Sequence, residues 1–145
     1  MKYDETEIRV RFNEVDSWGI AWHGHYLAWF EAGRMALLRK FQLLPQDFGR
    51  LGYLAPVVDV KCSYKEPARL DEELLIRTTV LRPTKAALTF RFQVLRKKDE
   101  KLLAAGEETQ VLLTLDGRML YHIPQDLQER LRLLLDYLAA PGSGA

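Results

Sequence analysis

A carboxylate and a helix start are the two features of this sequence whose residue types and spacing suggest chemistry. Asp16 lies seven residues before His23, and only a short Ser-Trp-Gly-Ile-Ala connection separates it from the segment Trp22-His23-Gly24-His25. That segment opens a helical pattern without Ser, Thr, Asp or Asn, the residues whose short side chains normally accept the first free N–H groups of a helix. We therefore expect backbone donors at this helix start that are free to bind a ligand oxygen.

Asp16 has two interpretations beside such donors. In the functional one, the backbone donors polarise a carbonyl while the carboxylate attacks it or activates water, which is acyl-transfer chemistry. In the structural one, the acid stabilises the positive end of the helix dipole. Structural networks also place acids at helix starts, so the pattern by itself favours the structural interpretation.

The helix that follows is expected over residues 24–41. Apolar residues occupy most of its circumference, and a helix that is apolar on most sides is normally buried. We expect the rest of the chain to wrap around it. The residues that make this pattern are Tyr26, Leu27, Trp29, Phe30, Ala32, Gly33, Met35, Ala36, Leu37, Leu38 and Phe41.

Most of the remaining chain has the period of strands. Residues 7–12 alternate, with Ile8, Val10 and Phe12 on one face, which predicts a first strand. Asp116-Gly117 indicates a hairpin turn. Further strands are predicted over residues 58–65, 74–81, 88–94 and 102–115, and an irregular or short helical connection over residues 46–54.

A second helix is predicted from Pro124, and it is amphipathic. Its apolar face carries Leu127, Leu131, Leu134, Leu135 and Leu138. One early helix followed by consecutive antiparallel strands is an α+β layout in which a sheet curls around the helix. We expect a single domain over residues 1–140 and a disordered tail over residues 141–145. A small sheet of this kind has exposed edges, so we also expect a homo-oligomer.

Composition excludes several other classes of protein. The chain has 145 residues, with 21 basic and 20 acidic side chains, and its net charge of +1 gives no bulk field for nucleic acid or an anionic membrane. No apolar run is long enough to span a bilayer, and we expect no signal peptide. One cysteine, Cys62, is expected to be a buried structural thiol, and the absence of a disulfide suits the cytoplasm. Three histidines, His23, His25 and His122, are spaced poorly for zinc, so we expect no metal.

Three blocks of residues resemble a known family. The first holds Asp16, Gly19, His23, Tyr26, Glu31 and Arg34; the second holds Tyr64, Pro67, Ala68 and Asp71; and the third runs from Ala105-Gly106 to Val111, with Pro124 at the final helix. In this order they resemble the 4-hydroxybenzoyl-CoA thioesterase family of hot-dog folds, including its bacterial short-chain acyl-CoA thioesterase branch. The resemblance implies a hot-dog fold, in which an antiparallel sheet is wrapped around one long central helix.

The resemblance also implies roles for single residues. Asp16 would be the catalytic carboxylate, as nucleophile or as general base, and the backbone N–H of His23 would bind the thioester oxygen. Glu31 and Arg34 would form an i,i+3 ion pair that orients the site residues without contacting the substrate. Relatives bind CoA at a subunit interface, which implies a homodimer or homotetramer. Seven residues are assigned to substrate binding: Trp18, Trp22, His25, Tyr26, Tyr64, Lys65 and Lys85.

Some of these assignments have simpler alternatives. Trp22 and Tyr64 are residue types that more often belong to a core, and Lys65 and Lys85 are ordinarily just solvated. Trp18 and His25 depart from the family, which commonly has a small residue and Asn at these positions. The resemblance therefore does not identify the acyl group of the substrate.

The sequence as a whole predicts an acyl-CoA thioesterase that releases a free acid and CoA without a metal or redox cofactor; CoA enters only as part of the substrate. The alternative is a non-catalytic module on the same fold that binds acyl-CoA or acyl-carrier protein.

Overall fold

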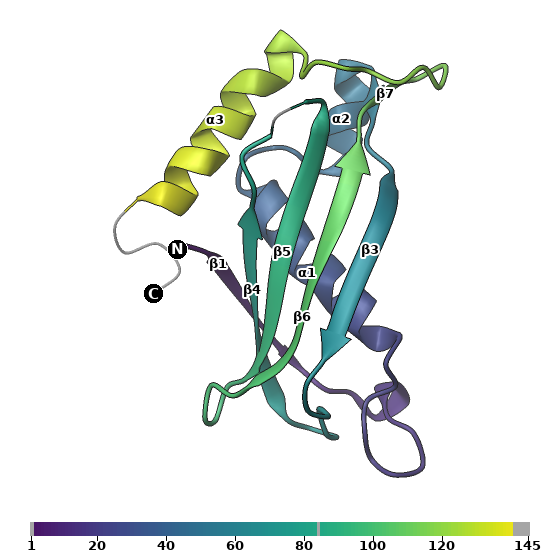
Figure 1. The fold of residues 1–145 in the computed structure, drawn as a ribbon, viewed down its shortest axis with the longest axis vertical. Helices are drawn as coiled ribbons and strands as arrows, with labels where there is room; N and C mark the ends of the chain where they lie inside the picture. Colours follow the sequence, from purple (N-terminus) through teal and green to yellow (C-terminus); the bar gives the residue numbers. More distant parts are fainter. Residues whose placement is uncertain (1, 84, 141–145) are drawn as a thin grey trace.

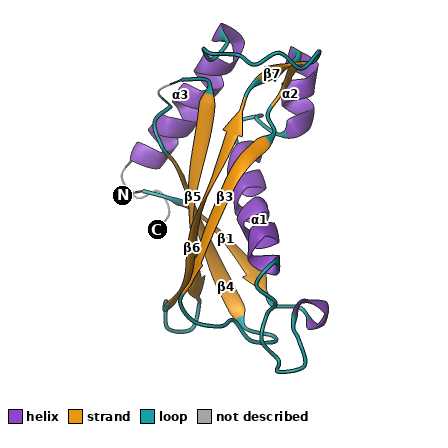
Figure 2. Cartoon of the chain, turned by 45° about the vertical axis from the view of Figure 1, so that its right-hand side comes forward, coloured by secondary structure: helices purple, strands orange, loops and turns teal. Residues whose placement is uncertain are grey.

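The computed structural model describes residues 2–83 and 85–140, and its main feature is an antiparallel sheet with a long helix against one face (Figures 1 and 2). The sheet has five strands in the order β1-β4-β5-β6-β3. The helix is α1 (His25–Arg39). The strands are β1 (Asp4–Arg9), β3 (Val57–Tyr64), β4 (Glu73–Val80), β5 (Ala87–Arg96) and β6 (Leu102–Val111). The α+β hot-dog arrangement predicted from the sequence is confirmed.

Two glycines show how closely α1 approaches the sheet. At Gly33, a Cβ atom would lie 2.5 Å from Thr78 Oγ1 and 2.8 Å from a methyl group of Ile76. At Gly106 on β6, it would lie 2.4 Å from the ring of Phe30. Phe30 is fully buried and stacks on Phe92 at 4.6 Å between ring centroids. The missing side chains thus create the space in which the helix meets the strands.

The expectation that α1 is buried on most sides is wrong for the single chain. Tyr26, Trp29 and Phe30 are buried, but Leu27 is 41% exposed and Glu31 is exposed as well. A five-stranded sheet covers only one side of a helix, so a strip of α1 stays open to solvent.

The first strand lies earlier than predicted. It ends at Arg9, and Phe12 belongs to a 3-10 turn, η1 (Phe12–Glu14), where it is 82% exposed. The Arg11 N–H donates to Glu14 Oε1 at 2.8 Å, which turns the chain out of the sheet before Phe12. The alternation predicted for Ile8 and Val10 still holds, because Val10 is buried and Ile8 packs against the core.

The other connections agree with the sequence except at the end of β6. The expected short helix is α2 (Pro45–Leu51), which β2 (Tyr53–Leu54) follows. The long last strand is divided into β6 and β7 (Leu113–Thr114), and β7 pairs with β2. The predicted turn is present, since Gly117 has φ 91° and its N–H donates to the Thr114 carbonyl.

The second helix, α3 (Gln125–Ala139), buries the predicted leucine face. Four of its leucines are buried and Leu135 is half-buried. Its C-terminal half meets the first strand and the end of α1: Tyr137 donates to Asp4 Oδ1 at 2.7 Å and packs on the ring of Phe41. The helix therefore covers the part of the core next to the first strand and the C-terminal end of α1. The expected tail, residues 141–145, lies outside the described residues. Within those residues, no helix combines the length and the apolar character needed to cross a membrane.

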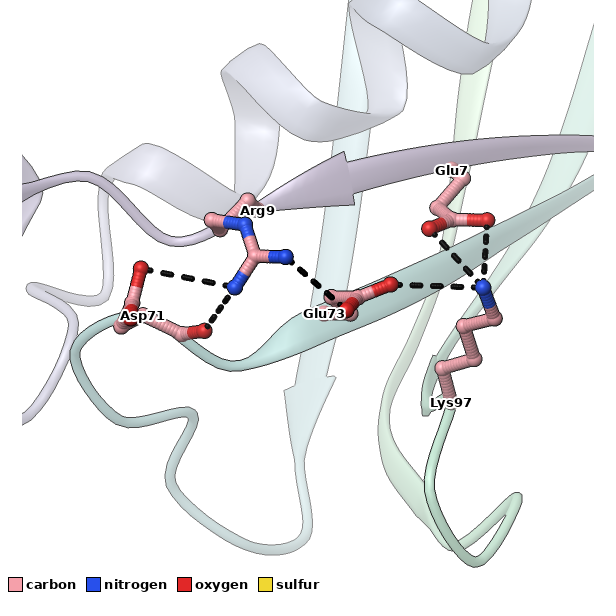
Figure 3. A network of polar contacts seen from close by, with 5 residues as sticks. All are labelled: Glu7, Arg9, Asp71, Glu73 and Lys97. Atoms are coloured by element: carbon pink, nitrogen blue, oxygen red, sulfur yellow. Dashed lines mark hydrogen bonds and ion pairs between the residues drawn. The ribbon is translucent and has the colours of Figure 1, made fainter.

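The two edges of the sheet differ in chemistry. Along β1, charged side chains form a continuous network with the neighbouring strand and turn: Arg9 contacts Asp71 and Glu73, and Lys97 contacts Glu73 and Glu7 (Figure 3). Along β3, every residue except the half-buried Cys62 is exposed. Its exposed apolar side chains are Val57, Val58, Val60 and Tyr64.

Candidate active site

The loop that carries Asp16 is closed on itself. The Asp16 N–H donates to the Ile20 carbonyl at 2.9 Å, and the Gly19 N–H donates to the Asp16 carbonyl at 3.0 Å. Gly19 has φ 74°, a conformation that glycine adopts without strain. The carboxylate of Asp16 is exposed, and its Oδ1 accepts from the N–H groups of Trp18 (2.8 Å) and Ile20 (3.3 Å). Among the described residues nothing donates to Oδ2, so one oxygen orients the side chain and the other stays open.

The start of α1 has no side-chain cap, as the sequence predicted. The His25 N–H donates to the Trp22 carbonyl at 3.0 Å, and the Tyr26 N–H donates to the His23 carbonyl at 3.4 Å. The N–H groups of His23 and Gly24 donate to no acceptor in residues 2–83 and 85–140. A Cβ atom on Gly24 would lie 2.1 Å from the indole of Trp22, so a side chain at this position would require the indole to move. In this conformation the tryptophan ring takes the place of a side chain at Gly24.

Glu14 anchors the loop to the helix, and the sequence analysis missed it. This residue is buried; its Oε2 accepts from the Trp29 indole at 3.0 Å, and its carbonyl accepts from the Trp22 N–H at 2.9 Å. Burial acts to raise the pKa of Glu14, but the bonds from the Arg11 N–H and the indole, with the Arg11 guanidinium, hold it below its ordinary value. Glu14 plays the part of the acid in a capping box, but Arg11 has no acceptor side chain, so the spacing gave no signal for this turn in the sequence.

A cleft of about 260 Å³ lies beside the helix start. Its lining residues are Ile20, Ala21, His23, Tyr26, Tyr64, Lys65, Glu66 and Pro67. Tyr64 donates from its hydroxyl to the His23 carbonyl at 2.7 Å, and the Tyr26 hydroxyl accepts from the Ala68 N–H at 3.1 Å. The cleft therefore brings together segments from the loop, α1 and the end of β3.

The comparisons with known proteins agree with this architecture. The sequence model of the thioesterase-like superfamily matches residues 10–131. The chain belongs to this superfamily. It is 40% identical to YneP of Bacillus subtilis over 80 residues, which is 55% of this chain and 58% of YneP. It is 30% identical to the acyl-CoA thioesterase YbgC of Haemophilus influenzae over 90 residues, covering 61% of this chain and 66% of YbgC.

Among solved structures, the fold matches Slr0204 of Synechocystis, a 1,4-dihydroxy-2-naphthoyl-CoA thioesterase, with a TM-score of 0.83. The match covers 96% of this chain and 99% of Slr0204 at 17% sequence identity, so it shows a shared fold.

In this thioesterase-like chain, four of the predicted site residues line the cleft: His23, Tyr26, Tyr64 and Lys65. The other predicted residues, Asp16 among them, do not line it. Trp18 is 80% exposed on the Asp16 loop, whereas Trp22 packs on the rings of His23 and His25 at 4.8 and 5.4 Å. Lys85 is exposed in the connection between β4 and β5. That connection lies at the opposite end of the sheet from the start of α1 (Figure 1). A single chain does not bring it to the cleft.

The predicted pair of Glu31 and Arg34 is present but is not the main contact of Arg34. Those two side chains are 3.8 Å apart, whereas Arg34 Nη1 lies 2.7 Å from Glu108 Oε2 on β6. Arg34 and Glu108 are each 7% exposed in their side chains, and burial raises the pKa of Glu108 although the guanidinium opposes that shift. The pattern of β6 gave no sign of an acid on its inner face.

The remaining predicted features are the burial of Cys62 and the spacing of the histidines. Cys62 is half-buried and not fully buried as predicted, because β3 lies at the sheet edge; partial burial still raises the pKa of its thiol. Within the part of the chain that the structure describes, no three side chains of His, Cys, Asp or Glu gather as metal ligands would.

Proposed function

We propose that this protein hydrolyses an acyl-CoA thioester to a free acid and CoA. The observation that carries the proposal is the pair of unoccupied N–H donors, on His23 and Gly24, at an uncapped helix start beside a cleft. Such donors stabilise the negative charge that develops on a thioester oxygen under attack. The name of the Haemophilus relative, an acyl-CoA thioesterase, supports the same activity.

Asp16 supplies the attacking group in this proposal. As a nucleophile, its free oxygen attacks the carbonyl carbon, CoA leaves as the thiolate, and water hydrolyses the resulting anhydride. As a general base, it takes a proton from a water molecule that attacks the same carbon. In both routes the N–H of His23 polarises the carbonyl. Because the carboxylate and the amide donors suffice for either route, we propose a reaction without metal or redox cofactor.

A second chain is proposed to complete the site. β3 is an edge strand, and Val58 and Val60 on it are 57% and 39% exposed. The strand ends at Tyr64 in the cleft, and the exposed Leu27 on α1 is also apolar. An exposed apolar edge is a template for pairing with another strand. We propose a homodimer or homotetramer that joins through β3, and the cytoplasm as its compartment, because the single Cys62 needs no oxidising environment.

The alternative is a module that binds acyl-CoA or acyl-carrier protein without catalysis. One observation favours it: Asp16 Oδ1 accepts two backbone N–H groups of its own loop, which is what a purely structural aspartate would do. The two functions differ in what they require of Asp16, because a binding module needs no carboxylate at that position.

The test is thiol release from short aliphatic, long aliphatic and aromatic acyl-CoAs. Asp16→Asn keeps the side chain's acceptor oxygen for the loop, so we expect it to fold normally, bind substrate and lose at least about a hundredfold in kcat. Asp136→Asn, on the exposed face of α3, is the matched control and should retain full activity. Full activity of Asp16→Asn, or no turnover of any thioester by the wild type, would support the binding module instead. Activity that survives dialysis against EDTA would agree with the metal-free route.

A further inference from the structure

One hydrogen bond joins the sheet edge to the peptide at the helix start. Tyr64, the last residue of β3, donates from its hydroxyl to the carbonyl oxygen of His23 at 2.7 Å. The same oxygen accepts the Tyr26 N–H at 3.4 Å, which is long for an N–H···O bond. The tyrosine hydroxyl is therefore the shorter contact of that carbonyl.

The carbonyl of His23 and the N–H of Gly24 belong to one peptide unit. In a planar trans peptide the C=O and the following N–H point in opposite directions, so a partner that fixes the oxygen also fixes the direction of the N–H. A hydrogen bond to the oxygen also polarises the unit and strengthens the N–H as a donor. The Gly24 N–H itself has no acceptor among the described residues.

This peptide has few other restraints. Gly24 has no side chain to limit its backbone, and the indole of Trp22 leaves no room for one. The helix has no side-chain cap at this end. The Tyr64 hydroxyl therefore adds a restraint from outside the helix to the long bond from the Tyr26 N–H.

Tyr64 is suited to be that partner. Its ring lies edge-on to the ring of Tyr26, with centroids 4.9 Å apart, and edge-on to the imidazole of His23 at 6.2 Å. Partial burial and the neighbouring Cys62 thiol raise the pKa of Tyr64 to about 12. The phenol therefore keeps its proton, and remains a donor, throughout the neutral range.

We propose that Tyr64 is a positioning residue that holds the His23–Gly24 peptide so that the Gly24 N–H, beside the N–H of His23, points at the thioester oxygen. This inference rests on the proposed function and gives Tyr64 a role other than the substrate contact expected from the sequence. A substrate contact would act on binding, whereas a positioning residue acts on the barrier, because the donors matter most where charge develops in the transition state.

The test is Tyr64→Phe, which removes the hydroxyl and keeps the ring. We expect kcat to fall about tenfold, the value of one hydrogen bond of this kind, while KM changes little. The loss should be the same factor for every acyl-CoA that the wild type accepts. The control is Tyr121→Phe, the same change at a tyrosine that is 70% exposed and lines no part of the cleft. An unchanged kcat, a rise in KM alone, or a loss that depends on the acyl group would overturn the proposal.

A second readout needs no substrate. In the amide spectrum of the intact protein, the Gly24 resonance should shift in Tyr64→Phe and stay in place in Tyr121→Phe. An unmoved resonance in Tyr64→Phe would overturn the proposal. The kinetic experiment also separates the two hypotheses. A wild type without turnover removes the proposed function, whereas an active wild type whose Tyr64→Phe variant is equally active removes only the role of Tyr64.

Discussion

The two edges of the sheet differ in how much apolar surface they expose. At the β1 edge, Lys97 lies 3.0 Å from Glu7 and 3.3 Å from Glu73, and Arg9 lies 2.9 Å from Glu73 (Figure 3). Charged side chains along an edge discourage pairing with another strand. At the β3 edge, valines are exposed instead, and the strand leads to the cleft. The sheet is thus closed by charged side chains along β1 and left open along β3, which ends at the cleft.

The ion pairs differ between the two sides as well. The β1 network is exposed, with side chains such as Lys97 and Glu7 each 47% accessible. On the β3 side, Arg34 and Glu108 form one buried pair in which Arg34 Nε and Glu108 Oε1 have no partner among the described residues. Exposed pairs are screened by water, whereas a broken buried pair leaves a charge without solvation. Mutations on the two sides should therefore have very different effects.

The largest effect is expected from Arg34→Met. Removing the guanidinium leaves the Glu108 carboxylate buried without its ion partner, so the free energy of unfolding should fall by about 3 kcal/mol. Urea unfolding measures this loss. Arg34→Met combined with Glu108→Met, which removes both charges, should recover most of the stability. A double variant as unstable as the single one would show that lost packing, and not the unpaired charge, is responsible.

Val60→Lys tests the open edge. An unpaired ammonium buried in an interface costs about 3 kcal/mol, enough to weaken association about a hundredfold. We expect the variant to dissociate in sedimentation experiments and to lose thioesterase activity in parallel. Leu133→Lys on α3 makes the same change at a side chain of similar exposure and should alter neither property. A Val60→Lys protein that remains associated and active would contradict the difference between the edges.

Glu14→Gln tests the anchor of the Asp16 loop through its pH dependence. The folded pKa of Glu14 lies below the ordinary value of 4.5, so its carboxylate stabilises the fold above that pH and loses this contribution as the pH falls. At pH 7 the variant should be less stable by about 1.5 kcal/mol, and the difference should shrink on acidification below about pH 4.5. Glu31→Gln, at an exposed acid, is the control. A difference that stays constant down to pH 3 would exclude the charge of Glu14 as the cause.

The smallest effect is expected from Lys97→Met at the closed edge. The contacts of Lys97 with Glu7 and Glu73 are exposed, and water solvates these charges almost as well when they are apart. The ion pairs therefore add little to the free energy of unfolding. Thermal unfolding should shift by about 2 °C or less, and added salt should remove that shift. A loss comparable to that of Arg34→Met would show that the β1 network is more cooperative than separate surface pairs.

Much of the fold could be predicted from local pattern. The uncapped helix start, the leucine face of α3 and the turn at Gly117 all follow from side-chain types at fixed spacing, and the structure confirms each. The end of the first strand could not be predicted in this way. Phe12 continues the alternation of Ile8 and Val10, but the Arg11 to Glu14 hydrogen bond turns the chain first.

The candidate site was predicted less completely. Asp16 and His23 stood out because both lie within one short segment. Glu14 and Glu108 did not, since their partners Trp29 and Arg34 lie 15 and 74 residues away in the chain. The proposed roles of Asp16 and the His23 N–H remain predictions until kinetic data exist.

By itself the sequence determined the order of elements, the helix start without a cap, and the loop that places Asp16 before it. These features depend on neighbours within a few residues, for which residue type and spacing are sufficient. Only the tertiary structure decided that the Tyr64 hydroxyl reaches the His23 carbonyl, that Arg34 pairs with Glu108, and that one sheet edge exposes three valines. Those contacts depend on strand order and register, which bring distant residues together and which no local pattern specifies.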